Sequence, residues 1–242
     1  MRVLDLFSGI GGFSLGLERA GFETVAFCEI DPFCRKVLAK HWPDVPCYED
    51  VNDVDPKTIS ARYVCGGFPC QPYSRANRKR KGTADKRDLS RKMLEIVEGI
   101  KPAAVIGENT EGFIDIGLAS YCDAMEEIGY YTTTLSVPAC GYGLPTLERH
   151  CWLISTPDSE QCERIAQVTI QGIERVAEQL PRSDTRIPKR WDSAESRVCR
   201  VGQRDPQIAH RIKALGNAVD PIMPEIIGRA IKEVEDARND WN

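Results

Sequence analysis

The chain has 242 residues, of which 42% are hydrophobic and 28% charged, the composition of a globular protein with a substantial buried core. Its net charge of −4 excludes a globally basic nucleic-acid-binding protein, so such contacts must come from local basic segments. No apolar run is long enough to cross a bilayer, and glycines interrupt MRVLDLFSGIGG where a signal peptide needs its apolar stretch. We therefore expect a cytoplasmic protein with no membrane contact.

Short apolar runs alternate with segments of helical periodicity through residues 1–156. Strands are predicted over residues 2–7, 24–30, 62–69, 103–109 and 150–155, and helices over 13–21, 32–42, 89–102 and 120–130. This alternation predicts an α/β fold with a doubly wound, mostly parallel sheet. Ligands of such sheets bind at the carboxyl ends of the strands, where the glycine-rich and polar segments of this chain fall.

The remainder divides into an insert and a returning segment. Residues 163–180 have helical periodicity, and 182–200 form an irregular stretch with six Lys/Arg against three Asp/Glu. We interpret 157–198 as a small insert. Residues 199–242 regain core character with a long predicted helix, so we expect them to rejoin the domain formed by 1–156.

The first candidate site is the stretch DLFSGIGGFSLGL, residues 5–17. A strand ends here, a glycine turn follows, and a helix begins, which lets backbone N–H groups approach a ligand closely. Glu29 follows the next strand about twenty residues later, the spacing of an acid that hydrogen-bonds a ribose. Asp50 is a third candidate at the same cleft. A structural turn and helix caps explain these residues equally well one by one, but together they favour a cofactor that carries a nucleoside.

The second candidate site is Cys70 in GGFPCQPYS. In the cytoplasm the ten cysteines should be thiols, mostly small core residues, and three histidines without a Cys-x-x-Cys pair argue against a metal site. Cys70 differs because it follows a strand in a glycine- and proline-bounded turn, where a thiolate can act as a nucleophile. Glu108 ends the next strand and can hold or donate a proton there, or simply cap a turn. The basic stretch 75–87 after Cys70 is either solvated surface or a phosphate contact.

GGFPCQ after DLFSGIGGF, followed in order by CEID, GENT and RIKALGNAV, resembles the C5-cytosine DNA methyltransferase family. The resemblance covers residues 1–155 and about 198–232. It implies S-adenosylmethionine as cofactor and double-stranded DNA as partner. It assigns the cofactor pocket to Phe7, Gly9, Ile10, Gly11, Gly12, Glu29, Ile30, Asp50, Val51, Pro69, Leu89, Asn217 and Ala218.

The resemblance also implies a reaction in which the Cys70 thiolate adds to C6 of a flipped-out cytosine while Glu108 acts at N3. Residues 75–87 resemble the family's mobile loop, which closes over the flipped base. The candidate nucleic-acid contacts are Gln71, Ser74, Arg75, Arg78, Lys79, Arg149, His150, Arg186 and Arg190. In the insert, Arg182 and Lys189 join the last two as basic residues that either contact DNA or form solubilising surface.

The sequence departs from the family in GLPTLERHCW, where the family has Gln-x-Arg-x-Arg after Gly-x-Pro. Thr146 replaces the glutamine, Glu148 the first arginine and His150 the second. Arg149 lies between them, and because neighbouring side chains of a strand face opposite ways, it cannot replace either arginine without a register shift or a bulge.

Three hypotheses remain open. The leading one is a monomeric DNA cytosine-C5 methyltransferase of a restriction-modification system or a phage, with a cognate restriction endonuclease as functional partner. The second is an enzyme that methylates transfer RNA, as one branch of the family does. The third, prompted by the departures in GLPTLERHCW, is a cofactor-binding protein that holds DNA without methylating it. The small insert predicts a short recognition sequence for a DNA enzyme.

Overall fold

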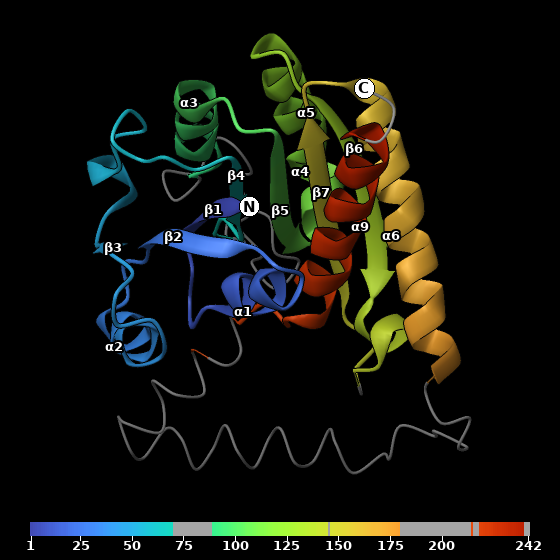
Figure 1. The fold of residues 1–242 in the computed structure, drawn as a ribbon, viewed down its shortest axis with the longest axis horizontal. Helices are drawn as coiled ribbons and strands as arrows, with labels where there is room; N and C mark the ends of the chain where they lie inside the picture. Colours follow the sequence, from blue (N-terminus) through green and yellow to red (C-terminus); the bar gives the residue numbers. More distant parts are fainter. Residues whose placement is uncertain (70–88, 145, 180–213, 215–217, 240–242) are drawn as a thin grey trace.

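A computed structural model of the chain describes residues 1–69, 89–144, 146–179, 214 and 218–239. Within these ranges the centre is a sheet with the strand order β3-β2-β1-β4-β5-β7-β6 (Figure 1). The strands are β1 (Arg2–Leu6), β2 (Glu23–Cys28), β3 (Cys47–Tyr48), β4 (Tyr63–Gly66), β5 (Ala104–Thr110), β6 (Tyr131–Pro138) and β7 (Arg149–Thr156). Strands β1 to β5 pair in parallel, whereas β7 is antiparallel to both of its neighbours. The predicted doubly wound, mostly parallel α/β fold is therefore confirmed.

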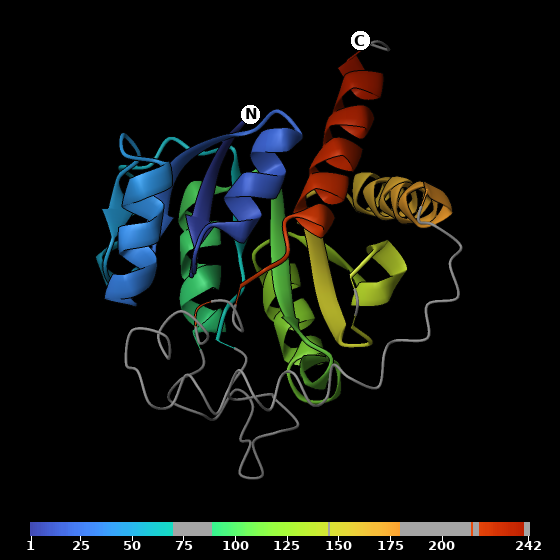
Figure 2. The same cartoon turned by 90° about the horizontal axis from the view of Figure 1, so that it is seen from below.

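Helices cover both faces of the sheet. The helices are α1 (Gly12–Arg19), α2 (Pro32–His41), α3 (Ser90–Ile100), α4 (Gly112–Ile116), α5 (Leu118–Glu127), α6 (Ser159–Gln179) and α9 (Ile222–Asn239), with short 3-10 turns η1 (Val51–Asp53) and η3 (Ala139–Tyr142). Side chains of α1, α6 and α9 form one buried cluster with the sheet, and those of α3 and α5 form a second. Figure 2 shows α1 and α9 close together on one side of the strands.

The central strands are apolar because both of their faces are covered. Val3 and Leu4 of β1 belong to different clusters on the two faces, as do Cys65 and Val64 of β4. Parallel strands that are buried on both faces are continuous apolar runs, so they can be predicted from the amino-acid sequence. The two strands outside the prediction lie at the sheet edges: β3 has only two residues, and β6 is a half-exposed run rich in threonine.

Helix α6 packs on the sheet although its sequence falls in the predicted insert. Ile165 is buried in the same cluster as Trp152 of β7 and Ile226 of α9, and the buried Cys162 donates to the carbonyl oxygen of Ile154 on β7 at 3.1 Å. Arg238 near the end of α9 also lies 3.4 Å from the Asp158 carboxylate that precedes α6. Residues 159–179 therefore form part of the layer around the sheet, while 180–213 fall outside the described residues. The proposed domain boundaries stay a prediction.

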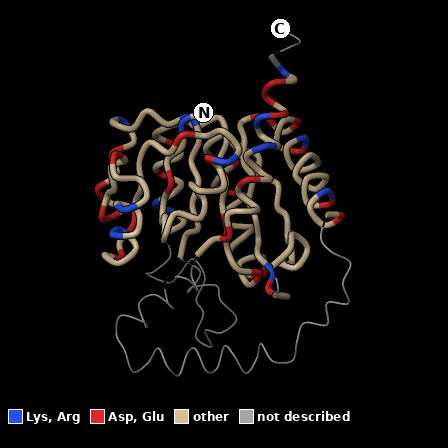
Figure 3. Tube along the Cα trace, turned by 60° about the horizontal axis from the view of Figure 1, so that its bottom comes forward, with Lys and Arg blue, Asp and Glu red and all other residues tan. Residues whose placement is uncertain are grey.

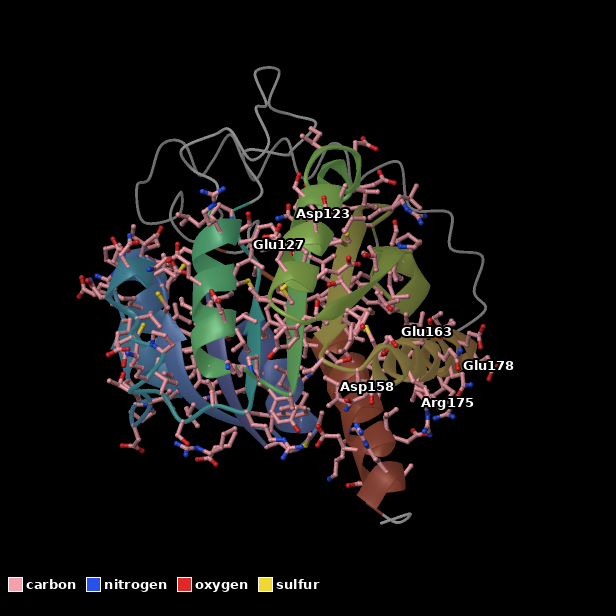
Figure 4. The ribbon with its side chains drawn as sticks, turned by 90° about the horizontal axis from the view of Figure 1, so that it is seen from above. Asp123, Glu127, Asp158, Glu163, Arg175 and Glu178 are labelled. Carbon is pink, nitrogen blue, oxygen red and sulfur yellow. The ribbon has the colours of Figure 1, made fainter. Side chains whose placement is uncertain are left out.

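Charged residues are spread over the surface of the described elements. Lys and Arg are mixed with Asp and Glu along the described chain trace (Figure 3). Glu163, Arg175 and Glu178 are exposed on the outer side of α6 (Figure 4). Among the described residues, no helix combines the length and the apolar character that crossing a membrane requires.

Candidate active site

The parallel strands bring the predicted site segments to one edge of the sheet. Leu6 at the end of β1 pairs with both Cys28 of β2 and Gly66 of β4, and Gly66 pairs with Gly107 of β5. The segments that follow these residues therefore start side by side. They contain the glycine loop, the acid after β2, the approach to Cys70, and Glu108.

The three glycines of the loop meet different surroundings. A Cβ at Gly9 would have no heavy atom within 4 Å, so this backbone faces open space. A Cβ at Gly11 would lie 2.6 Å from the Trp42 ring, and one at Gly12 would overlap the carbonyl oxygen of Val219. Gly9 and Gly11 also adopt positive φ, at 54° and 89°, which favours glycine. Gly9 thus leaves room for a ligand, whereas Gly11 and Gly12 allow close packing.

Glu29 is fixed beside Gly9. One carboxylate oxygen accepts a hydrogen bond from the Gly9 N–H at 2.7 Å, and the other accepts one from the Asp31 N–H at 2.7 Å. Asp31 in turn caps α2 by accepting a bond from the Phe33 N–H at 2.9 Å. A carboxylate has about four acceptor sites, so Glu29 keeps capacity for hydroxyl groups of a ligand.

The other predicted cofactor residues lie around this loop. Ile30 is 72% exposed directly after Glu29, unusual for an isoleucine and suited to an apolar ring. Asp50 accepts a bond from the Asn52 N–H at 2.8 Å and so holds η1, where Val51 is buried. Phe7 packs on the cluster beneath the loop together with Leu89. Ile10 and Ala218 are half-buried.

The approach to Cys70 passes directly against Glu108. A Cβ at Gly67 would lie 3.1 Å from Oε2 of Glu108 and 3.7 Å from a methyl group of Val219. Asn109, which is fully buried, donates from its side-chain amide to the carbonyl oxygen of Phe68 at 3.2 Å. The end of β5 therefore holds both the Glu108 carboxylate and the backbone two residues before Cys70. Sequence reasoning gave Asn109 no role, although its place after Glu108 at a strand end was the available signal.

His150 contacts Glu108, and its predicted contact with a nucleotide stays a prediction. Its Nδ1 lies 2.7 Å from Oε1 of Glu108, across the antiparallel pair of β5 and β7. The hydrogen bond to Glu108 raises the pKa of His150, and burial opposes this shift. The pair is an ion pair whenever the imidazole is protonated.

Arg149 points away from this pair. Its guanidinium donates to the backbone oxygen of Ser136 at 2.9 Å and lies 3.4 Å from the Glu111 carboxylate. His150 and Arg149 thus have different partners, as the alternation of side chains along a strand predicts. In the described structure Arg149 does not take the place of either family arginine.

A family model for C-5 cytosine-specific DNA methylases matches residues 1–168. The chain belongs to this family. Among the relatives of this chain, Type II methyltransferase M2.BsuMI of Bacillus subtilis (strain 168) is 32% identical over 164 residues, 64% of this chain and 42% of the relative. Type II methyltransferase M.HhaI of Haemophilus parahaemolyticus is 34% identical over 160 residues, 64% of this chain and 48% of the relative. Each match spans less than half of the relative.

Solved structures of methyltransferases share the fold. A methyltransferase encoded within a prophage of E. coli superposes with a TM-score of 0.55 at 25% identity, covering 66% of this chain and 48% of that chain. The Entamoeba histolytica methyltransferase EhMeth gives a TM-score of 0.56 at 19% identity, covering 65% and 53%. Membership in the family implies S-adenosylmethionine as methyl donor.

Several predicted site residues of this C-5 cytosine methylase family member fall outside the described residues. They are Cys70, Gln71, Ser74, Arg75, Arg78, Lys79, Arg186, Arg190 and Asn217. Their roles stay predictions, as does the role of residues 75–87 as a loop over the base. Pro69 is described and is half-buried beside this segment. Within the described ranges, no three His, Cys, Asp or Glu side chains gather to hold a metal ion.

Sequence reasoning did not find the buried acid beneath the glycine loop. Asp5 of β1 is fully buried, and one of its oxygens accepts a bond from the Ser14 hydroxyl at 2.7 Å. Burial raises the pKa of Asp5 to about 7, although the Ser14 hydrogen bonds oppose the shift. Asp5 is therefore only partly ionised at neutral pH. An acid inside an apolar strand was the only signal in the sequence.

Proposed function

We propose that this chain is a DNA cytosine-5 methyltransferase that acts on a cytosine flipped out of duplex DNA. The observation that carries the proposal is the convergence of Gly67, Phe68 and Glu108. The backbone that leads to the family's cysteine runs against the carboxylate that the reaction needs at the base. Family membership and the ordered motifs support the same activity.

The residues around the glycine loop fit S-adenosylmethionine. Gly9 leaves open space, Glu29 keeps acceptor capacity beside it, and the exposed Ile30 follows. We expect Glu29 to bind the ribose, Ile30 to contact the adenine, and Asp50 to face the adenine amino group. When bound, S-adenosylmethionine supplies an electrophilic methyl group.

The protein residues make cytosine C5 nucleophilic. The Cys70 thiolate adds to C6, the π electron pair of the C5–C6 double bond shifts toward C4, and N3 takes a proton that Glu108 relays from solvent. C5, now part of an enamine, takes the methyl group. The C5 proton then leaves to solvent, N3 returns its proton, and the bond between sulfur and C6 breaks. Asn109 supports these reaction steps by holding the backbone at Phe68 against the end of β5.

We propose a restriction-modification system or a phage as the setting of this activity. The similar curated proteins are type II methyltransferases, and one similar structure comes from a prophage. In that setting a cognate endonuclease cuts unmethylated sites and is a functional counterpart of this chain. We further propose that the chain acts in the cytoplasm as a monomer.

The test measures transfer of labelled methyl from S-adenosylmethionine to unmethylated duplex DNA and, in parallel, to transfer RNA. We expect label in DNA, its loss in Cys70→Ala, and its retention in the control Cys122→Ala, which alters a half-buried thiol on α5. DNA carrying 5-fluorocytosine should form a stable adduct with the wild-type chain. Label in transfer RNA alone would show that the substrate is RNA instead of DNA. Binding of S-adenosylmethionine with neither label nor adduct would favour a protein that binds the cofactor without methylating a nucleic acid.

A further inference from the structure

His150 stands where the family pattern stated above has an arginine, and it contacts Glu108. Nδ1 of His150 lies 2.7 Å from Oε1 of Glu108. Both side chains are mostly buried, with 27% of His150 and 15% of Glu108 exposed. Oε2 of Glu108 lies beside Gly67, on the approach to Cys70. One oxygen of the carboxylate is thus held by His150 while the other faces the reaction site.

The charged groups that act on His150 from the surrounding elements are acids. Glu108 acts from β5, Glu148 from the segment before β7, and Asp220 from the segment before α9. Two further titratable groups lie here, the phenol of Tyr142 on η3 and the thiol of Cys151 on β7. Burial followed by the charge of Asp220 raises the pKa of Tyr142 well above the ordinary value, and burial followed by the charge of Glu108 raises the pKa of Cys151 to about 12. Tyr142 and Cys151 therefore stay neutral near pH 7, and the balance of charge depends on the imidazole of His150.

Protonation of His150 changes the electrostatics at the base. With the imidazolium present, the carboxylate of Glu108 has a partner of opposite charge in a mostly buried place, where such pairing matters more than in water. With neutral imidazole, Glu108, Glu148 and Asp220 leave an uncompensated acidic cluster. Such a cluster repels the lone pairs of N3 and O2 on the cytosine ring. An arginine cannot switch in this way because it keeps its charge at any working pH.

We propose that protonated His150 is the positioning residue that holds Glu108 for the methyl transfer and makes the reaction depend on pH. The proposal rests on the proposed function. When it is protonated, His150 supplies the positive charge beside Glu108 that an arginine would supply at any working pH. Methyl transfer then slows at alkaline pH as His150 loses its proton, even though the Cys70 thiolate becomes more abundant there.

The kinetic test compares kcat/KM for methyl transfer to unmethylated plasmid DNA between pH 6 and 9. The wild-type chain is compared with His150→Arg, His150→Gln and the control His41→Gln, which alters an exposed histidine at the end of α2. We expect an alkaline decline in the wild-type and control proteins. It should vanish in His150→Arg, which remains active, and His150→Gln should be slower than wild type at pH 6.5 by about tenfold or more. An unchanged decline in His150→Arg, or full activity of His150→Gln at pH 6.5, would overturn the proposal.

A second readout needs no turnover. The chain has three histidines, His41, His150 and His210, so the imidazole NMR signal of His150 can be assigned by its loss in His150→Arg. We expect Glu108→Gln to lower the pKa of His150 and leave the His41 signal unchanged. An unchanged pKa of His150 in Glu108→Gln would overturn the charge pairing. If the wild-type chain transfers no methyl at any pH, the proposed function fails and the positioning role of His150 in that reaction fails with it, whereas the NMR titration still tests the charge pairing with Glu108.

Discussion

Asp5 shows how one buried group couples stability to pH in this molecule. Its carboxylate lies at the end of β1 beneath the glycine loop, with Oδ2 bonded to the Ser14 hydroxyl and Oδ1 without a hydrogen-bond partner among the described groups. The negative charge of Glu29 adds to the effect of burial. The folded protein therefore retains a proton on Asp5 that the unfolded chain releases.

We predict that Asp5→Asn removes a pH-dependent loss of stability. Because the folded-state pKa of about 7 exceeds the unfolded value near 4, the wild-type free energy of unfolding falls as pH rises between these values. From pH 5 to 8 the wild-type chain should lose about 2–3 kcal/mol more than Asp5→Asn, at ~1.4 kcal/mol per pH unit. Urea denaturation at both pH values measures this difference. The control Asp44→Asn alters an exposed acid and should follow the wild-type protein, and parallel pH profiles for wild type and Asp5→Asn would contradict the prediction.

At the scale of elements, the first and last helices meet through glycine. A Cβ at Gly12 would overlap the carbonyl oxygen of Val219, and one at Gly16 would overlap that of Pro221. The C-terminal segment can therefore reach the glycine loop only because these positions lack side chains. Met223 and Ile227 of α9 are then buried in the same cluster as Phe13 and Leu17 of α1.

We predict that Gly12→Ala destabilises the protein by about 1–3 kcal/mol, the usual cost of inserting a methyl group where the backbone leaves no space. It should also weaken binding of S-adenosylmethionine, because the loop and the segment at Ala218 shift apart. Chemical denaturation and calorimetric titration measure the two effects. Gly141→Ala is the control, since its Cβ would meet atoms at 3.7 Å, an ordinary contact. Equal stability of Gly12→Ala and Gly141→Ala would contradict the prediction, because it would show that the backbone at Val219 moves to accommodate the methyl group without a loss of stability.

The elements differ in how far the sequence predicts them. Strands β1, β4 and β5 are continuous apolar runs because helices cover both faces, and their carboxyl ends correctly located the glycine loop and Glu108. Strand β6 lacks that pattern because it is a half-exposed edge. Helix α6 was placed in the insert because periodicity reveals an apolar face but not the surface against which it packs. Likewise the partner of His150 depends on pairing between β5 and β7, which the sequence of either strand does not contain.

At the scale of the whole molecule, the net charge of −4 means that binding of DNA requires Lys and Arg to be concentrated locally. Over the described elements, acidic and basic residues are mixed (Figure 3). In the sequence, Lys and Arg are concentrated in residues 75–87, after Cys70, and in 182–200, across the end of the predicted insert. We therefore propose that these two segments contact DNA and expect the described surface of α6 to contribute little.

We predict that Arg186→Glu/Arg190→Glu weakens DNA binding while leaving the fold and cofactor binding intact. Loss of two phosphate contacts should lower the slope of log K against log salt by about one unit each, because each contact releases condensed counterions. The control Arg164→Glu/Arg175→Glu makes the same change of charge at two exposed positions of α6. A simple effect of net charge would weaken binding equally in both variants, whereas a recognition insert predicts loss only in the first. Fluorescence anisotropy at several salt concentrations, with the melting temperature and affinity for S-adenosylmethionine of each variant, separates these outcomes. Retained affinity in Arg186→Glu/Arg190→Glu would place recognition of DNA elsewhere in the chain.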